Sequence, residues 1–184
     1  VASTDPDVLA RCAEGQSPSV FWLGCSDSRV PEGQVIRAGL GEVFVHRNVA
    51  NLFTPDDTSA TAALAYAVNH LKVSHVVVVG HEKCGGCAAA LSVAQTKPVS
   101  TTDDIGEQAI AKWIEPIRAI AAKHLEKTPG VELSTIVHSN VCAQVSNVVN
   151  HSVLKKAWAR GQAVSVHGWV YDLATGKLND LGVT

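Results

Sequence analysis

The chain has 184 residues, 46% of them hydrophobic, and a formal net charge of −2 at pH 7. A chain of this length can bury one sizeable core but is short for two ordinary domains, so we expect a single domain over residues 1–184. The near-neutral charge argues against a nucleic-acid partner, which normally requires a strongly basic surface. Apolar stretches are far shorter than the roughly 18 residues of a membrane-spanning helix, so no membrane partner is expected either.

The first half of the chain alternates helical patterns with short apolar runs. Asp5 and Pro6 suit the N-cap and the first position of a helix, and we expect that short helix over residues 5–15. Helical patterns are also present over residues 31–36 and 57–71. Runs of β-branched and aromatic residues predict buried strands of a parallel sheet, and these runs are residues 20–23, 43–47 and 76–79.

The middle of the chain is expected to be helical. A Gly-Gly pair begins a helix over about residues 85–94, and a polar loop follows over residues 98–104. Isoleucines recur at helical spacing over residues 105–120, which predicts a helix in the core or at an interface. Pro116 is expected to kink or divide that helix, because proline removes a backbone donor and clashes with the preceding turn.

The last third of the chain combines a long helix with two strands. Residues 133–160 have a helical pattern with an expected break near His151. A strand, a turn and a second strand follow at residues 164–173 and 177–179. Strands that alternate with helices predict an α/β core over residues 19–184.

Two short runs carry the strongest chemical signal, a Cys-Ser-Asp-Ser-Arg run at residues 25–29 and a His-Glu-Lys-Cys run at residues 81–84. Each run begins just beyond a glycine that ends a predicted parallel strand, so Cys25 and His81 can meet at one edge of the sheet. Two cysteines and one histidine are a ligand set typical of catalytic zinc, which keeps a fourth position open. We therefore predict that Cys25, His81 and Cys84 bind one Zn²⁺ per chain.

Three separated motifs resemble the β class of carbonic anhydrases. They are Trp-Leu-Gly-Cys-Ser-Asp-Ser-Arg-Val-Pro at residues 22–31, Gly-Glu-Val-Phe-Val-His-Arg-Asn-Val-Ala-Asn at residues 41–51, and Gly-His-Glu-Lys-Cys-Gly-Gly at residues 80–86. Residues 158–162 and 166–171 are also similar to that family. The resemblance implies a central parallel sheet of four strands with an added edge strand, flanked by helices. It also implies a homodimer or a homotetramer.

The resemblance implies an activity and roles for individual residues. The expected reaction is the zinc-dependent, reversible hydration of carbon dioxide to bicarbonate and a proton by zinc-bound hydroxide. Asp27 and Arg29 are the expected catalytic residues, because an Arg fork can hold a carboxylate that orients the hydroxide. The backbone N–H of Gly85 is expected to contact bicarbonate. Asp27 has a second expected role as the fourth zinc ligand of an inactive state.

Regulation and two other functions stay open. One subtype of the family has a regulatory bicarbonate site at the positions of Trp22, Arg47 and Tyr66, and plain packing of these side chains is the alternative. A non-catalytic protein that binds zinc and bicarbonate would use the same ligands, with Asp27 closing the metal site. A hydrolase of a CO2-like molecule such as carbon disulfide would use the same chemistry.

Five cysteines, two of them assigned to zinc, indicate a reducing compartment rather than a disulfide framework. Cys87 forms a Cys-x-x-Cys pair with Cys84, as in redox proteins. A zinc-bound Cys84 cannot take part in such a pair, so we expect Cys87 to be a small buried residue at a helix start. The expected location is the cytoplasm, with a mitochondrion or another organelle as the alternative if a targeting peptide has been removed.

Overall fold

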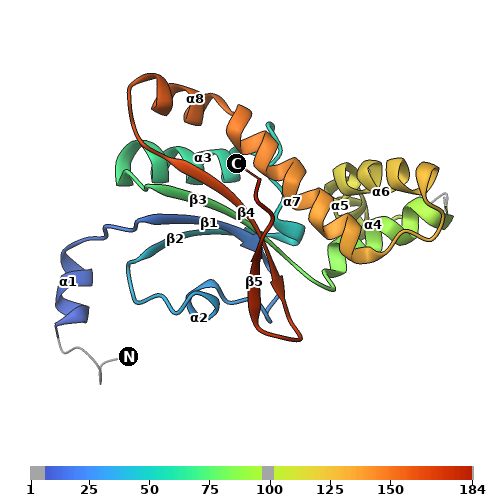
Figure 1. Cartoon of the computed structure of the whole chain (residues 1–184), viewed down its shortest axis with the longest axis horizontal. Coiled ribbons are helices and arrows are strands. Elements are labelled where there is room, and N and C mark those ends of the chain that lie inside the picture. Colours follow the sequence, from blue (N-terminus) through green and yellow to red (C-terminus); the bar gives the residue numbers. More distant parts are fainter. Residues whose placement is uncertain (1–6, 97–101, 184) are drawn as a thin grey trace.

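A five-stranded sheet forms the centre of the computed structural model, which describes residues 7–96 and 102–183 (Figure 1). The sheet has the strand order β2-β1-β3-β4-β5. The first four of these strands are parallel, and β5 pairs antiparallel with β4. The strands are β1 (Val20–Cys25), β2 (Val43–Asn48), β3 (His75–His81), β4 (Ser165–Asp172) and β5 (Lys177–Asp180). The predicted α/β fold, with four parallel strands and an added edge strand, is confirmed.

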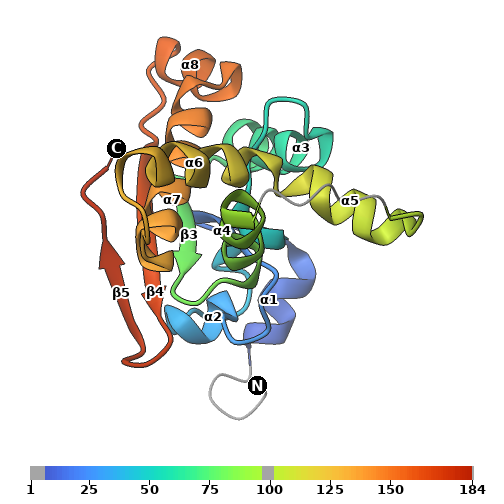
Figure 2. The same cartoon turned by 90° about the vertical axis from the view of Figure 1, so that its right-hand side faces the viewer.

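Helices cover both faces of the sheet and extend beyond one edge (Figures 1 and 2). Helices α3, α7 and α8 lie over one face, and α1 and α2 lie on the other side. Helices α4, α5 and α6 lie beyond the carboxyl ends of the parallel strands. The α-helices are α1 (Val8–Glu14), α2 (Glu32–Val35), α3 (Thr58–Tyr66), α4 (Gly85–Thr96), α5 (Ile105–Trp113), α6 (Glu115–Lys127), α7 (Leu133–Asn150) and α8 (Ser152–Ala159). In the part of the chain that the structure describes, no helix is both long and apolar enough for a membrane span.

Most predicted helix boundaries agree with the structure. Asp57 is the N-cap of α3, and its side chain accepts hydrogen bonds from two backbone N–H groups of the first turn. The isoleucine-rich pattern divides at Ile114, and Pro116 lies in the first turn of α6, where proline is tolerated. His151 ends α7 and caps α8. Helix α1 begins at Val8, so the predicted start at Asp5 and Pro6 lies outside the described residues, as does most of the predicted loop over 98–104.

The strands of the sheet centre are buried on both faces, which explains their continuous apolar sequences. Side chains of a strand alternate between the two faces. In β1, Phe21 and Leu23 therefore belong to the main core with α3 and α7, and Trp22 belongs to a smaller cluster on the opposite face. Trp22 has no exposed surface, and Val77 and Val79 of β3 pack in the same cluster. Both faces of the sheet thus contribute to stability.

Only the second part of the isoleucine-rich pattern belongs to the core. Ile114 and Ile117 are buried, whereas α5 has no buried residue and Ile105 is 82% exposed. Of the two predicted places, the core is therefore wrong for α5, and the interface stays a prediction. Hydrophobic spacing identifies an apolar helix face, but it does not tell whether the same chain covers that face.

Close packing between β4 and α7 gives a prediction about stability. A Cβ added at Gly168 would lie 2.7 Å from Val183, 3.0 Å from Val145 and 3.1 Å from Val141. We expect Gly168→Ala to lower the free energy of unfolding by about 1–3 kcal/mol, because these branched side chains cannot move aside freely. Urea denaturation measures the change. Gly15→Ala is the matched control, because nothing lies within 4 Å of its added Cβ, and equal effects of the two changes would contradict the packing argument.

Candidate metal centre

The sheet brings three predicted metal ligands together. Strand β1 ends at Cys25, the adjacent parallel strand β3 ends at His81, and Cys84 immediately precedes α4. The two sulfur atoms and a ring nitrogen of His81 all lie within 4.8 Å of one another. All three side chains are buried. The predicted set of donors is therefore brought together at the carboxyl edge of the sheet, where α/β proteins commonly bind ligands.

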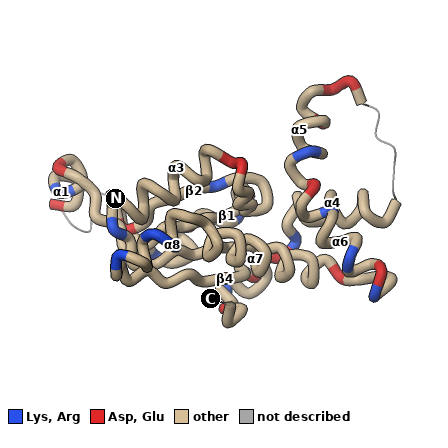
Figure 3. The backbone as a smooth tube through the Cα atoms, turned by 90° about the horizontal axis from the view of Figure 1, so that it is seen from above, with Lys and Arg blue, Asp and Glu red and all other residues tan. Residues whose placement is uncertain are grey.

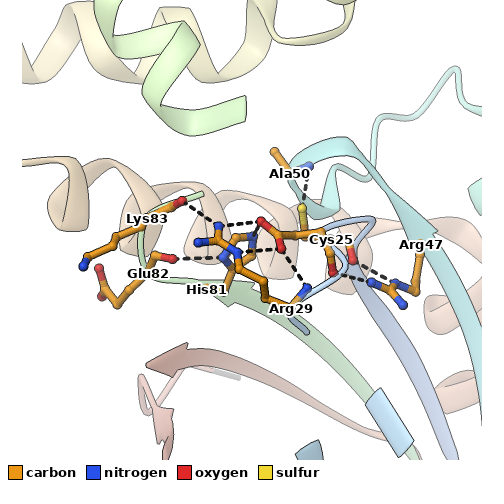
Figure 4. Close-up of polar contacts among 8 residues, drawn as sticks. Cys25, Arg29, Arg47, Ala50, His81, Glu82 and Lys83 are labelled. Atoms are coloured by element: carbon orange, nitrogen blue, oxygen red, sulfur yellow. Dashed lines mark hydrogen bonds and ion pairs between the residues drawn. The ribbon is translucent and has the colours of Figure 1, made fainter. Parts of the chain in front are cut away.

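The His81 ring is oriented for a cation. Its Nδ1 lies 2.9 Å from the carbonyl oxygen of Glu82, so Nδ1 is the nitrogen that carries hydrogen and donates (Figure 4). Its Nε2 is buried and has no hydrogen-bond partner among the described residues. A buried nitrogen lone pair without a partner is unfavourable. Metal-binding histidines commonly donate their other nitrogen to a carbonyl oxygen in this way, so the residues present fit a metal ion.

The two thiols also favour a cation. The Cys84 thiol and burial raise the pKa of Cys25 to about 12. The Cys25 thiol lowers the pKa of Cys84, but Cys87 and burial have the larger combined effect and raise that pKa to about 11. Two adjacent buried thiolates are unstable without a positive charge between them. A divalent cation would therefore bind in competition with protons.

Asp27 and Arg29 form a closely paired carboxylate and guanidinium beside this cluster. Arg29 donates from Nε to Oδ1 at 2.9 Å and from Nη2 to Oδ2 at 2.7 Å. The backbone N–H of Arg29 also donates to Oδ1. These hydrogen bonds hold the pKa of Asp27 well below its usual range. Asp27 Oδ2 lies 3.7 Å from His81 Nε2, so the ionised carboxylate is directed toward the predicted metal ligands.

The predicted trio of Trp22, Arg47 and Tyr66 does not come together. Trp22 lies on the sheet face that carries the smaller cluster, and Arg47 donates to the carbonyl oxygens of Cys25 and Asp27. Tyr66 stacks on Phe44, which packs against the main core on the opposite face. The prediction that these three residues share one pocket is therefore wrong within this chain. Trp22 points from β1 to one face of the sheet, whereas Tyr66 belongs to α3, which covers the opposite face.

Gly85 lies at the start of α4, directly after the predicted ligand Cys84. The first N–H groups of a helix have no intrahelical acceptor and carry a partial positive charge. A Cβ at Gly85 would meet nothing within 4 Å. The position expected to contact bicarbonate therefore has an N–H group of the first helical turn and no side chain that would block its approach.

The sequence analysis missed a backbone contact to the site and the side chains that support it. The backbone N–H of Ala50 donates to Cys25 Sγ at 3.4 Å (Figure 4). Asn140 of α7 donates to the carbonyl oxygen of Ala50, and Gln144 donates to Asn140. The sequence feature that could have revealed them is the pair Asn140 and Gln144, two amides four residues apart on a helix face that is otherwise apolar.

Comparisons with known proteins agree with this geometry. Residues 20–178 match the family model described as carbonic anhydrase. A carbonic anhydrase of Emericella nidulans is 37% identical over an alignment 184 positions long, which covers 97% of this chain and 76% of that protein.

Two solved structures are similar over almost the whole chain. A Coccomyxa β-carbonic anhydrase in complex with acetazolamide has 38% identity and a TM-score of 0.86, covering 98% of this chain and 79% of that chain. A tetrameric β-carbonic anhydrase of Sordaria macrospora has 35% identity and a TM-score of 0.83, and the match covers 98% of this chain and 89% of that chain. With its parallel sheet, its Cys25–His81–Cys84 cluster and these matches, the chain belongs to the β-class carbonic anhydrase family of enzymes.

Proposed function

We propose that this chain binds zinc through Cys25, His81 and Cys84 and catalyses the reversible hydration of carbon dioxide to bicarbonate and a proton. The observation that carries the proposal is the buried cluster of two thiols and an imidazole nitrogen without a partner. Zinc bound there would lower the pKa of a bound water to around 7 and so supply a nucleophile at neutral pH. Family membership supports the same reaction.

Asp27 would orient the attacking water. An ionised carboxylate accepts hydrogen bonds and donates none. Because Arg29 holds Asp27 ionised, a water molecule beside it must direct an O–H toward the carboxylate. The oxygen lone pair then faces away from Asp27 and toward the substrate. Arg29 would act through this carboxylate, and its Nη2 also donates to the carbonyl oxygen of Lys83 at 3.3 Å, which fixes the guanidinium.

The backbone N–H of Gly85 would bind the bicarbonate product. Negative charge develops on the substrate oxygens as carbon dioxide becomes bicarbonate. The N–H groups and the dipole at the start of α4 favour a negative charge at this position. Glycine leaves the approach open, because it has no side chain.

The pairing of Asp27 with Arg29 bears on the non-catalytic alternative. Both carboxylate oxygens of Asp27 accept a hydrogen bond from the guanidinium, and these bonds oppose a movement of Asp27 onto the metal. This arrangement favours an open fourth position and thus the enzyme. The inactive state with Asp27 on zinc stays a prediction, and so does a regulatory role for Trp22 and Arg47.

The exposed apolar face of α5 supports assembly with further copies of this chain. Helix α5 projects from the body of the molecule (Figure 3). Ile105 is 82% exposed, and Ile110 is 47% exposed. Exposed apolar residues gathered on one element mark interaction surfaces. We propose that a second copy covers this face, as part of a dimer or tetramer.

The state of the cysteines supports a reducing compartment such as the cytosol. All five thiols are free. Cys87 is buried at the start of α4, as expected for a small packing residue. Oxidation of Cys84 would remove a proposed zinc ligand, so the proposed activity requires reduced thiols.

Metal analysis tests the proposed ligands. We expect about one zinc ion per purified chain. The variants Cys25→Ser, His81→Asn and Cys84→Ser should each lose most of the metal, because three protein ligands are needed for tight binding. Elemental analysis measures zinc, and circular dichroism checks the fold. Cys87→Ala is the matched control and should keep its zinc; a loss as large as that of Cys84→Ser would refute the assignment.

Stopped-flow hydration of carbon dioxide tests the role of Asp27. We expect Asp27→Asn to lower kcat/KM by about 10–100-fold with zinc content unchanged, because an amide no longer imposes one water orientation. Asp56→Asn, at an exposed position outside the site, is the control and should keep full activity. A zinc-loaded wild-type chain that does not hydrate carbon dioxide would disprove the proposed function, and hydrolysis of carbon disulfide by that sample would favour the alternative substrate.

Light scattering after size-exclusion chromatography tests the assembly. We expect the wild-type chain to form a dimer or a larger oligomer. Ile105→Asp should weaken self-association by about tenfold or more, because it places a charge in the proposed apolar contact. Ala174→Asp adds the same charge in an exposed turn between β4 and β5 and should leave the mass unchanged. An unchanged mass for Ile105→Asp at all concentrations would exclude α5 from the contact.

A further inference from the structure

Residues 49–53 connect the metal ligands to the long helix α7. We call them the 49–53 segment. Its Ala50 N–H donates to Cys25 Sγ at 3.4 Å, where it adds a hydrogen bond to a proposed metal ligand (Figure 4). A hydrogen bond to a ligating sulfur draws electron density away from it and so changes how strongly the sulfur donates to the metal. The position of this one N–H group therefore affects the metal directly.

The segment has an unusual backbone. Ala50 has φ of 61° and Asn51 has φ of 49°, so two consecutive residues other than glycine adopt the left-handed conformation. Such a conformation persists only where surrounding contacts hold it. Without those contacts, the backbone at Ala50 would relax and its N–H would turn away from Cys25.

Three amide side chains of α7 supply those contacts. Asn140 Nδ2 donates to the carbonyl oxygen of Ala50 at 2.9 Å. Gln144 Oε1 accepts from the Phe53 N–H at 3.0 Å, and Asn147 Nδ2 donates to the Phe53 carbonyl oxygen at 2.9 Å. Gln144 Nε2 also donates to Asn140 Oδ1, which fixes the orientation of both amides.

The three amides stand out on an apolar helix face. Asn140 and Gln144 are each 1% exposed, among buried side chains of α7 such as Val141 and Val145. A buried amide is unfavourable unless its hydrogen bonds are made, and apolar residues of similar size would pack there at lower cost. The amides are therefore explained by the backbone groups that they contact.

The segment is also held from its other sides. Asn48 accepts from the Leu52 N–H and donates to the Leu52 carbonyl oxygen. Trp113 Nε1 donates to the Val49 carbonyl oxygen at 2.8 Å. A Cβ added at Gly86 would lie 3.0 Å from both Val49 and Ala50, so the start of α4 presses on the same residues. Hence the segment lies between the elements that carry Cys25 and Cys84.

We propose that Asn140, oriented by Gln144, is a positioning residue of the metal centre, an inference that rests on the proposed zinc site. It holds the Ala50 backbone in the left-handed conformation and so fixes the N–H against Cys25 Sγ. The hydrogen bond limits electron donation from Cys25 and keeps the metal strongly electron-withdrawing. Asn140 thus acts on the metal across two hydrogen bonds, without contacting it.

Cobalt(II)-substituted protein tests this proposal, because the thiolate-to-cobalt charge-transfer absorption reports on the sulfur itself. In Asn140→Leu, we expect this absorption to move to longer wavelength, since a sulfur that has lost its hydrogen bond gives up electrons more easily. We also expect the dissociation constant for the metal to change by about tenfold. Ser139→Ala removes a hydrogen bond of the same helix to His124 and should leave the absorption unchanged.

A milder variant keeps the test decisive if Asn140→Leu does not fold. Asn147 is half-buried, and among the described residues it donates to the segment at the Phe53 carbonyl oxygen and, within α7, to Gln144 Oε1. Asn147→Ala should therefore shift the absorption in the same direction by a smaller amount. A wild-type chain without thiolate absorption would overturn the zinc site itself. If the wild-type chain shows the absorption band and the folded variants show it at the same wavelength, only the proposed role of Asn140 is overturned.

Discussion

Parallel pairing between β1 and β3 is the contact on which the candidate metal centre depends. The two strands pair in register from Val20 and His75 to Gly24 and Val79, so both end at the same edge of the sheet. Cys25 and His81 then emerge side by side, although they are far apart in the sequence. If β1 slipped by one residue against β3, every side chain of β1 would point to the opposite face of the sheet.

Around this pairing, polar contacts determine what the centre can do. The carbonyl oxygen of Glu82 selects the hydrogen-bearing nitrogen of His81, and Arg29 keeps Asp27 ionised. The amides of α7 hold the backbone beside Cys25. None of these groups would contact a bound metal; each acts through one or more neighbouring groups. The resulting site offers a metal three fixed donors and one side that faces a carboxylate.

The sequence was sufficient for the parts of the site that depend on residue type. Cys25, His81 and Cys84 could be predicted because few side chains bind zinc and because each follows or adjoins a strand end. The 49–53 segment could not be predicted, because its contact with Cys25 comes from a backbone N–H that every residue but proline has. Tyr66 was misplaced because motif position does not tell which face of the sheet a neighbouring helix covers. The exposure of α5 was also unpredictable, because a partner chain can bury what one chain leaves open.

The order of the strands along the chain also affects how the protein is made. Strand β1 lies between β2 and β3 in the sheet, and β3 is synthesised after both of the others. Cys84 and His81 are close in sequence, but Cys25 joins them only after a long loop has closed, which is entropically costly and slow. During translation, Cys25 therefore leaves the ribosome as an unprotected thiol well before its two partners. Correct maturation depends on keeping that thiol reduced until β3 has been made and paired.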